Sequence, residues 1–184
     1  YLSLFDYGTD QNDAFFVDSG LTYSGGATTT LSGLDHLEGQ SVTILANGAT
    51  HPNKTVSGGS ITLDRSSTKV HVGLNYTSLL QTMRVELQGE GGTSQSKDKR
   101  IHEVTLRLHE TVGVEVGPNL DNMERIPFRS SAAAMDQAVP LFTGDKEVEF
   151  RDDFNTDGFV FVRQTQPLPL TLLSAYPRIT VNDG

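Results

Sequence analysis

The chain has 184 residues, no cysteine and a formal net charge of −9, from 23 acidic and 14 basic residues. Its length allows one ordinary domain or two small ones, and the lack of cysteine excludes disulfides and thiolate metal sites. The acidic balance argues against nucleic-acid binding, which needs clustered Lys and Arg. The 18 glycines and the low aromatic content of 8% are typical of a turn-rich all-β protein, and no apolar run is long enough to span a membrane.

Residues 1–30 are expected to form leading strands. Because the chain starts at Tyr1 rather than at a methionine, we expect it to be a piece of a longer protein. Ala14–Val17 and Leu21–Tyr23 indicate a strand or a hairpin, with Asp18–Gly20 as the turn between them. We expect residues 1–30 to pair with strands that follow residue 75, so that the module between them is an insertion between strands of one sheet.

Residues 31–75 predict a small β-barrel module. Three short runs alternate apolar and polar side chains: Val42–Ala46, Ser60–Leu63 and Lys69–Leu74. This period of two is typical of half-buried strands, because successive side chains point to opposite faces of a sheet. Asn47-Gly48 and Ser57-Gly58-Gly59 tolerate the positive φ that tight hairpins need. The segment Gly33–Gly39 predicts a turn ahead of these strands.

Residues 76–184 predict a second β-rich region, an antiparallel sandwich or sheet. Its longest alternation is Ile101–Glu110. Three apolar residues are expected on the inward face of this strand: Val104, Leu106 and Leu108. We expect the strand to pair with Met83–Gln88 across the polar, glycine-rich loop Gly89–Asp98.

Further strands are predicted towards the end of the chain: Val112–Val116, Glu147–Phe150, Phe159–Arg163 and Leu170–Ala175. Ser131–Gln137 predicts one or two helical turns. Two prolines in Gln166–Pro169 cannot donate to a ladder, so this segment is expected to be an edge or a connection. Strand signals that recur about every 8–12 residues favour a sandwich or barrel architecture.

Six phrases of the sequence resemble one family of virion proteins. They are GLDHLEGQSVTILANG, VSGGSITL, VHVGLNYTSLLQT, RIHEVTLRL, LFTGDKEVEF and PLPLTLLSAYPRI, and they span nearly the whole chain. The chain resembles structural proteins of tailed bacteriophages, which are described as tail, tail-nozzle or tail-tube components. The resemblance implies a non-catalytic component of the virion tail. Such a component acts through contacts with other copies in a homo-oligomeric ring and with neighbouring tail proteins.

The segment Asp153–Gly158 matches the first half of a calcium-binding loop. Asp153, Asn155 and Asp157 place oxygen ligands at alternate positions, and a glycine stands sixth. The twelfth position is Gln164, where such a loop requires a bidentate glutamate, and the flanking residues predict strands rather than helices. The alternative interpretation is a plain hairpin turn between Phe150 and Phe159.

No other cluster has the layout of a catalytic or metal site. The five histidines have neither the same-face strand spacing nor the helical spacing of a zinc pair. His36 and His51 are expected in turns, His71 and His109 on the outward faces of strands, and His102 at the start of a strand. The sequence contains neither a Gly-x-Ser-x-Gly elbow nor a Gly-x-x-x-x-Gly-Lys phosphate loop. We therefore predict that the chain is not an enzyme and binds no cofactor.

Further expectations concern the partners of the chain. The only basic cluster, Lys97–Arg100, contains an aspartate and predicts a solvated strand approach rather than a nucleic-acid site. An acidic wall would let transiting DNA pass without sticking. Contacts with other copies are expected at Gly89–Asp98, Gly33–Gly39 and Pro167–Pro177.

The alternative function is a binding module at a tail tip, either carbohydrate-recognising or stabilised by calcium. Four tyrosines are available to stack on sugars: Tyr7, Tyr23, Tyr76 and Tyr176. The chain has no tryptophan, which argues against a sugar platform because stacking favours large aromatic faces. A calcium-dependent rise in Tm that is lost on Asp157→Ala would favour this alternative.

Overall fold

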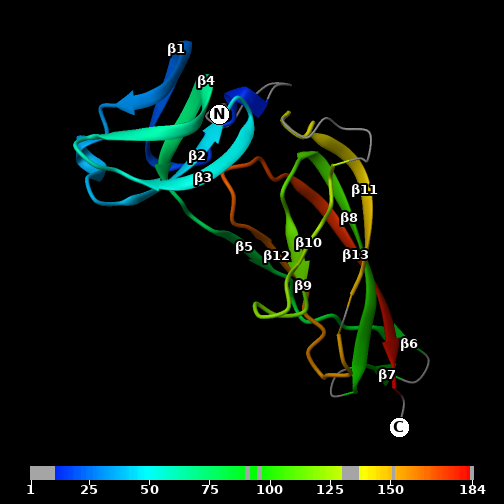
Figure 1. The fold of residues 1–184 in the computed structure, drawn as a ribbon. Helices are drawn as coiled ribbons and strands as arrows, with labels where there is room; N and C mark the ends of the chain where they lie inside the picture. Colours follow the sequence, from blue (N-terminus) through cyan, green and yellow to red (C-terminus); the bar gives the residue numbers. More distant parts are fainter. Residues whose placement is uncertain (1–10, 90–91, 95–96, 130–136, 151, 183–184) are drawn as a thin grey trace, which may run out of the picture. The chain divides into compact units, whose positions relative to one another are not determined.

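The protein is described here by a computed structural model that covers residues 11–89, 92–94, 97–129, 137–150 and 152–182 (Figure 1). In these ranges it consists of antiparallel strands and two short 3₁₀ helices, which confirms the predicted all-β fold. The elements in chain order are η2 (Gln11–Asp13), β1 (Asp18–Ser32), η3 (Asp35–Leu37), β2 (Ser41–Ala46), β3 (Ala49–Thr55), β4 (Ser60–Leu74), β5 (Ser78–Gln81), β6 (Gln88–Gly89), β7 (Gly92–Thr93), β8 (Lys99–Thr111), β9 (Glu115–Gly117), β10 (Glu124–Arg125), β11 (Phe142–Glu149), β12 (Phe161–Gln164) and β13 (Leu172–Val181).

The chain divides into two compact units. The first unit contains Tyr1–Thr77, Phe128–Leu141 and Thr165–Pro169, and the second contains Ser78–Pro127, Phe142–Gln164 and Leu170–Gly184. The first change of unit lies close to the boundary expected after residue 75. The chain then returns twice to the first unit, which the sequence did not indicate.

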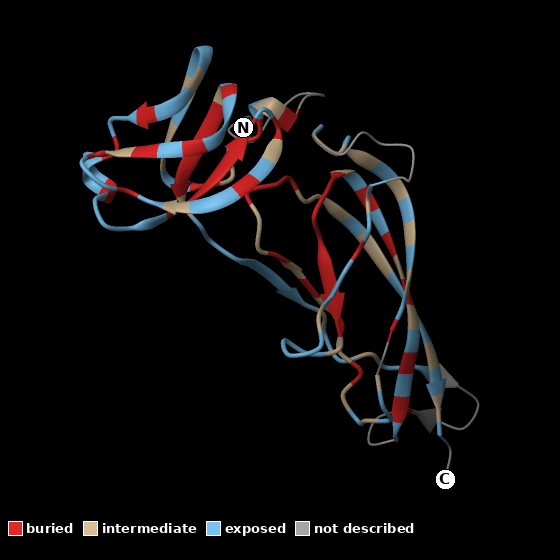
Figure 2. Ribbon diagram, viewed as in Figure 1, coloured by how far each residue is buried: buried red, intermediate tan, exposed pale blue. Residues whose placement is uncertain are grey.

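The first unit is built on one four-stranded sheet, in the order β1-β4-β2-β3. The turn between β2 and β3 is Asn47-Gly48, and both residues have positive φ (50° and 72°), as expected of a tight hairpin. The core consists of eleven buried apolar residues: Leu31, Leu34, Leu37, Val42, Ile44, Ala46, Val56, Ile61, Leu63, Val70 and Val72. A fully buried side chain of this kind stabilises the fold by roughly 1.5–3 kcal/mol. Figure 2 accordingly shows β2 in red along most of its length.

The chain turns from β3 into β4 at Ser57–Gly59. Ser57 forms an isolated bridge with Ser60, the first residue of β4, and β3 and β4 share no continuous ladder. Further along, the His51 Nε2 accepts a hydrogen bond from the Asp64 N–H (2.9 Å), and the Lys54 ammonium lies 2.5 Å from the Asp64 carboxylate. Side chains therefore close this side of the module.

Strand β1 corrects the expectation for residues 1–30. It pairs with β4 inside the first unit and not with the second region. Leu21 and Tyr23 pack against the core of the first unit, and this burial explains where the strand lies. The turn expected at Asp18–Gly20 is an irregularity within one continuous strand, at a place where the register shifts.

Strand β4 is one element where two were predicted. Ser60–Leu63 and Lys69–Leu74 are joined by the polar residues Asp64–Thr68. Within this stretch Ser67 pairs with Thr28 of β1, and the register shifts on both sides of that pair. Gly73 lies where β4 passes very close to β1. A Cβ atom at this position would lie 2.6 Å from the Asp18 carbonyl oxygen, so a larger residue would force the strands apart.

The second unit contains a three-stranded sheet in the order β11-β8-β13. Strand β8 matches the predicted Ile101–Glu110 strand. Three apolar residues on its inward face are fully buried, as predicted: Val104, Leu106 and Leu108. Near its start the register shifts between Arg178 and Ile179 of β13, which leaves His102 as the extra residue of a β-bulge.

A four-stranded sheet, in the order β10-β9-β12-β5, belongs to the same unit. Its two central strands contribute Val116 and Val162, each 1% exposed. Strand β5 lies at one end of this sheet and pairs with β12.

Met83–Gln88 does not pair with β8, so that prediction is wrong. Both sides of β8 are occupied by β11 and β13. The side chain of Met83 is 88% exposed, and Leu87 is exposed as well. An alternating pattern indicates a possible strand, but it does not show which other strand buries the apolar face.

The predicted hairpin between Phe150 and Phe159 is also wrong. Phe150 follows β11 of the three-stranded sheet, whereas Phe159 precedes β12 of the four-stranded sheet. The segment between them therefore connects two sheets. It contacts β8 through a bridge between Asn155 and Lys99.

The remaining predictions differ from the structure mainly at element boundaries. The strands predicted at Val112–Val116, Glu147–Phe150, Phe159–Arg163 and Leu170–Ala175 correspond to β9, β11, β12 and β13. Gln166–Pro169 connects β12 to β13, as expected of a proline-containing segment. The helical turns predicted at Ser131–Gln137 and part of the loop Gly89–Asp98 lie outside the described residues.

Candidate functional site

The side chains of the candidate calcium loop are engaged in contacts within the protein. The Asn155 Oδ1 accepts hydrogen bonds from the N–H groups of Asp157 (2.9 Å) and Gly158 (2.7 Å), which forms an Asx turn. The Asn155 Nδ2 donates to the Asp152 carboxylate (3.1 Å). The Asp157 carboxylate lies 2.5 Å from the Arg84 guanidinium. Oxygen atoms that a calcium ion would use therefore already have partners.

Asp153 completes the set of predicted ligands, and its side chain is exposed. Within the described ranges, no group of three or more His, Asp or Glu side chains is placed to hold a metal ion. Calcium binding by Asp153, Asn155 and Asp157 stays an untested alternative, and the Asx turn is the role that the contacts of Asn155 support.

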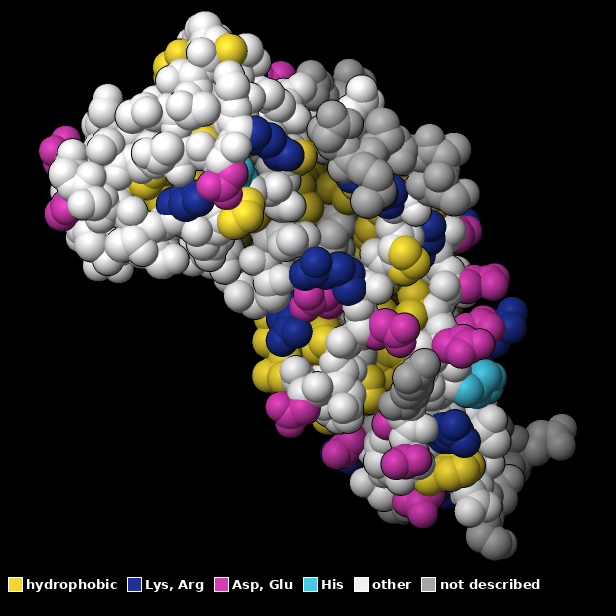
Figure 3. Space-filling view, viewed as in Figure 1, with side chains coloured by type: hydrophobic (Ala, Val, Ile, Leu, Met, Phe, Trp, Pro, Cys, Tyr) yellow, Lys and Arg dark blue, Asp and Glu magenta, His cyan; other side chains and the backbone are white. Residues whose placement is uncertain are grey.

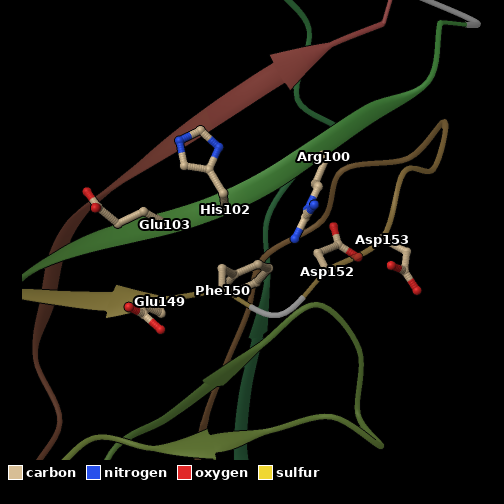
Figure 4. Close-up of a pocket in the computed structure, with 7 residues that line it drawn as sticks. All are labelled: Arg100, His102, Glu103, Glu149, Phe150, Asp152 and Asp153. Carbon is tan, nitrogen blue, oxygen red and sulfur yellow. The ribbon is translucent and has the colours of Figure 1, made fainter.

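A shallow hollow of about 590 Å³ lies beside this loop (Figure 4). It is lined by Arg100, His102, Glu103, Glu149, Phe150, Asp152 and Asp153. The first three come from β8, and the others come from β11 and the segment that follows it. In Figure 4, Arg100 points towards Asp152, whereas His102 and Glu149 point in other directions.

Asp152 is a carboxyl group of this hollow with a shifted pKa. Burial raises the pKa of Asp152 above its ordinary value, against the opposing effect of the hydrogen bond from Asn155. A carboxyl group with a raised pKa can serve as a general acid where it reaches a substrate. In this hollow, His102 and Glu149 do not point towards Asp152, so these three side chains form no acid–base pair.

Two histidines are buried as structural hydrogen-bonding groups. The His71 Nε2 donates to the Asn12 carbonyl oxygen (2.7 Å), and its Nδ1 accepts from the Thr22 hydroxyl (2.8 Å). The His51 Nδ1 donates to the Pro52 carbonyl oxygen (2.8 Å). The outward position predicted for His71 is therefore wrong, because the N-terminal segment covers that face of β4. The prediction that His51 lies in a turn is also wrong, because His51 belongs to β3.

The remaining histidines do not gather at one place. His36 lies in η3, as expected of a turn residue, and its Nε2 donates to the Ser19 carbonyl oxygen (2.8 Å). His102 and His109 are exposed on β8. The five histidines thus lie in five separate local environments and form no shared site.

The basic cluster Lys97–Arg100 is not a uniformly solvated segment, contrary to the prediction. Lys99 is only 1% exposed, and its ammonium donates to the Val85 carbonyl oxygen (3.0 Å). The side chain of Lys99 also packs against Gly158, where a Cβ atom would lie 3.1 Å from the lysine Cδ. Alternation around β8 would have revealed this burial, because Lys99 stands two residues before the buried Ile101.

Glu115 links three strands of the four-stranded sheet, and no motif in the sequence indicates this role. Its carboxylate contacts Arg125 of β10 (3.1 Å) and Arg163 of β12 (2.9 Å). Burial alone would raise the pKa of Glu115, but the two guanidinium groups together outweigh it and hold the pKa below its ordinary value. Both arginines are engaged with this carboxylate, so the cluster is structural in character.

The expected contact elements differ in what they expose. Gly33–Gly39 contains exposed polar residues around the buried Leu34 and Leu37. Pro167–Pro169 is buried, so the first part of the expected contact element Pro167–Pro177 is not on the surface. Only the later part of that element reaches the surface.

Large apolar side chains are exposed in both units. Among the described residues they are Phe15, Tyr76, Leu79, Leu80, Met83, Leu87, Leu120, Phe154, Leu173 and Tyr176. Figure 3 shows hydrophobic side chains at the surface of the second unit, interspersed with charged ones. Half of the ten fall within the short stretch Tyr76–Leu87, so this stretch is the clearest candidate for contact with another molecule.

In the part of the chain that the structure describes, no helix has the length and apolar character that crossing a membrane requires. Comparison with known proteins gives no match to a protein-family model and no match to a curated protein.

Proposed function

We propose that this chain is a non-catalytic structural component of a bacteriophage tail, of the nozzle, tube or tail-associated type. It acts through contacts between subunits in a ring assembly. Its partners are other copies of itself and neighbouring tail proteins, and its location is the tail of the virion. The proposal rests on the sequence resemblance, supported by one observation: polar side chains hold the fold together, while large apolar side chains stay exposed.

The polar side chains of the described residues are used mainly inside the fold. His51 and His71 fasten strands and the N-terminal segment, Asn155 forms a turn, and Glu115 joins three strands. A catalytic site instead needs groups that converge on a substrate with altered pKa values. This use of polar groups supports a scaffold.

The exposed apolar side chains support a role in assembly. A cluster of apolar residues at the surface of a soluble chain commonly marks a contact with another protein. In a ring, the same contact recurs around the symmetry axis, so that each one can be weak while the closed assembly is stable.

An acidic wall facing transiting DNA is part of the same proposal. Asp145, Glu147 and Glu149 alternate along β11, so their carboxylates lie on one face of that strand. Such a row would repel phosphate groups if it faced the channel of a ring. Asp145 is paired with Arg107 (2.8 Å), which leaves most of the row's charge in place.

Native mass spectrometry of the purified chain over a wide range of concentrations tests the proposal. We expect closed assemblies whose masses are whole multiples of 20.0 kDa, with one multiple dominant at high concentration. Negative-stain images of that species should show rings. A chain that stays monomeric at every concentration would contradict the proposal, as would turnover of a polysaccharide by the pure protein.

A further inference from the structure

We propose that β5 is an open sheet edge that pairs with β5 of a second copy of this chain, antiparallel and about a two-fold axis. This inference does not depend on the tail assignment. Strand β5 ends the four-stranded sheet, and in the described part of the chain its ladder partner is β12. All four of its residues are exposed, and Figure 2 shows the strand in pale blue along its length.

The backbone of β5 offers unused hydrogen-bonding groups on its outer side. The Thr82 N–H donates to the Val160 carbonyl oxygen (3.0 Å), so Thr82 is a residue whose backbone faces β12. Backbone groups alternate in direction along a strand. Leu80 therefore also faces β12, whereas the N–H and C=O groups of Leu79 and Gln81 face outward. A second strand can accept and donate at these positions.

The side chains of β5 show that the buried apolar face of the sheet is incompletely covered at this edge. Leu80 pairs with Val162, which in turn pairs with Val116, and both valines are 1% exposed. Leu80 lies on the same face of the sheet as these buried residues, yet it is 44% exposed. A further strand beside β5 would cover it.

The other edges of the three larger sheets carry features that prevent pairing with a second chain, and β5 does not. Charged residues, prolines and bulges are the usual means of protecting an edge. The protected edges are β10 (Glu124, Arg125), β11 (Asp145, Lys146, Glu147, Glu149), β13 (Pro177, Arg178), β3 (Pro52, Lys54) and β1, whose register shifts three times. Strand β5 has no charge, no proline and no register shift.

A second copy of the chain is the partner that fits this edge. Two copies with a net charge of −9 each repel one another, so they can approach most easily through an uncharged surface. The stretch Asn75–Met83 contains no charged residue, and Asn75–Gln81 is exposed throughout. This uncharged, self-similar edge suits an identical copy better than a charged partner.

The direction of the backbone groups limits the register of the pair. Outward-facing residues must pair with outward-facing residues, and the register that uses both such residues of β5 places Leu79 of one copy opposite Gln81 of the other. The two Leu80 side chains then face each other across the axis, in a pair without mutual hydrogen bonds, where Cα atoms are about 4.5 Å apart. The incompletely covered apolar faces of the two sheets thus meet at Leu80.

Such a pair is weak by itself. A four-residue edge buries far less than the roughly 1,200–2,000 Å² of a stable interface. The dimer therefore forms at high protein concentration, or as one of several contacts in a larger assembly.

Sedimentation equilibrium of the 184-residue chain at increasing concentration tests the pairing. Variants that place a positive or a negative charge at position 80 show whether the two copies meet there. The samples are the unaltered chain, Leu80→Lys, Leu80→Glu and an equimolar mixture of the two variants. We expect the unaltered chain to associate with a dimer as its first species, whether or not larger assemblies follow. Each variant should form this dimer about tenfold or more weakly, because like charges lie opposite each other. The mixture should regain dimers, since an ammonium then faces a carboxylate.

Leu173→Lys is the matched control, because Leu173 is an exposed leucine (60%) on β13 and should leave the association unchanged. Circular dichroism and thermal melting confirm that the Leu80 variants fold. A monomeric unaltered chain would overturn the proposal, and so would dimers that persist in both Leu80 variants or a mixture that fails to recover. Dimers that persist in both variants, or a mixture that fails to recover, would leave ring contacts at other surfaces possible, and the native masses decide those. A chain that is monomeric at every concentration would contradict both proposals.

Discussion

At the scale of single residues, His71 shows how tertiary structure changes the environment that a sequence pattern predicts. Alternation places it on the outer face of β4, but it is only 4% exposed. Phe15 meets its ring edge-on at 5.6 Å, and the Asn12 carbonyl oxygen accepts its proton. Both residues come from a segment nearly sixty positions earlier, so the local pattern around His71 holds no trace of them.

This burial makes the stability of the first unit depend on pH. Burial lowers the pKa of His71 below its ordinary value near 6.5, although the hydrogen bond to Asn12 opposes the shift. A histidine with a lowered pKa in the folded state stabilises the fold fully above about pH 6.5, and this contribution is lost as the pH falls from there through the folded-state pKa. We expect the free energy of unfolding to fall more steeply below pH 6.5 in the unaltered chain than in His71→Gln.

Urea unfolding at pH 7.5 and pH 5.5 measures this difference. The exposed His109→Gln serves as the matched control and should behave like the unaltered chain. Equal pH dependence in the unaltered chain and His71→Gln would show that the burial of His71 does not govern stability in this range.

At the scale of elements, the sequence predicts strands well and their partners poorly. Strand β8 was recognised because its alternation continues over ten residues, and the β2–β3 hairpin because Asn47-Gly48 demands positive φ. Strand β1 was misplaced because its Ser, Thr and Gly residues carry little apolar pattern. Pairing depends on which apolar faces are buried together, and this is decided by contacts between residues far apart in the chain.

The same limit applies to the candidate site. The Asp153–Gly158 motif was visible in the sequence, but the role of Asn155 depends on the conformation of its own turn. Glu115, Arg125 and Arg163 lie on three strands and carry no motif that would connect them. Clusters of this kind become visible only once the strand order is known.

The Asx turn leads to a prediction for the connection between β11 and β12. Asn155→Ala removes the acceptor of two backbone N–H groups, and we expect it to lower the free energy of unfolding by about 1–2 kcal/mol. Calcium chloride in place of a chelator should change the Tm of neither the unaltered chain nor Asp157→Ala. Thermal melting followed by circular dichroism provides both measurements.

Asp153→Ala is the control for this element, because the exposed Asp153 side chain takes no part in the turn and its loss should be close to neutral. A calcium-dependent rise in Tm that disappears in Asp157→Ala would contradict the structural role of the loop. Such a result would support the calcium-stabilised binding module instead.

At the scale of the whole molecule, the chain is all-β and has two compact units. Some of its polar side chains are buried, while several large apolar side chains are exposed. The fold class follows from composition and alternation alone. The division into units does not, because segments 128–141 and 165–169 return to the first unit after long excursions. In the proposed function, the chain acts through what its exposed strands contact, and the sequence of one chain does not specify those contacts.

Cryo-electron microscopy of intact phage particles that contain this chain tests the central claim most directly. We predict that the chain can be traced in density as several identical copies around the tail axis, with exposed apolar residues at the contacts between subunits. Density that places the chain outside the tail, or as a single copy without contacts to identical neighbours, would contradict the account.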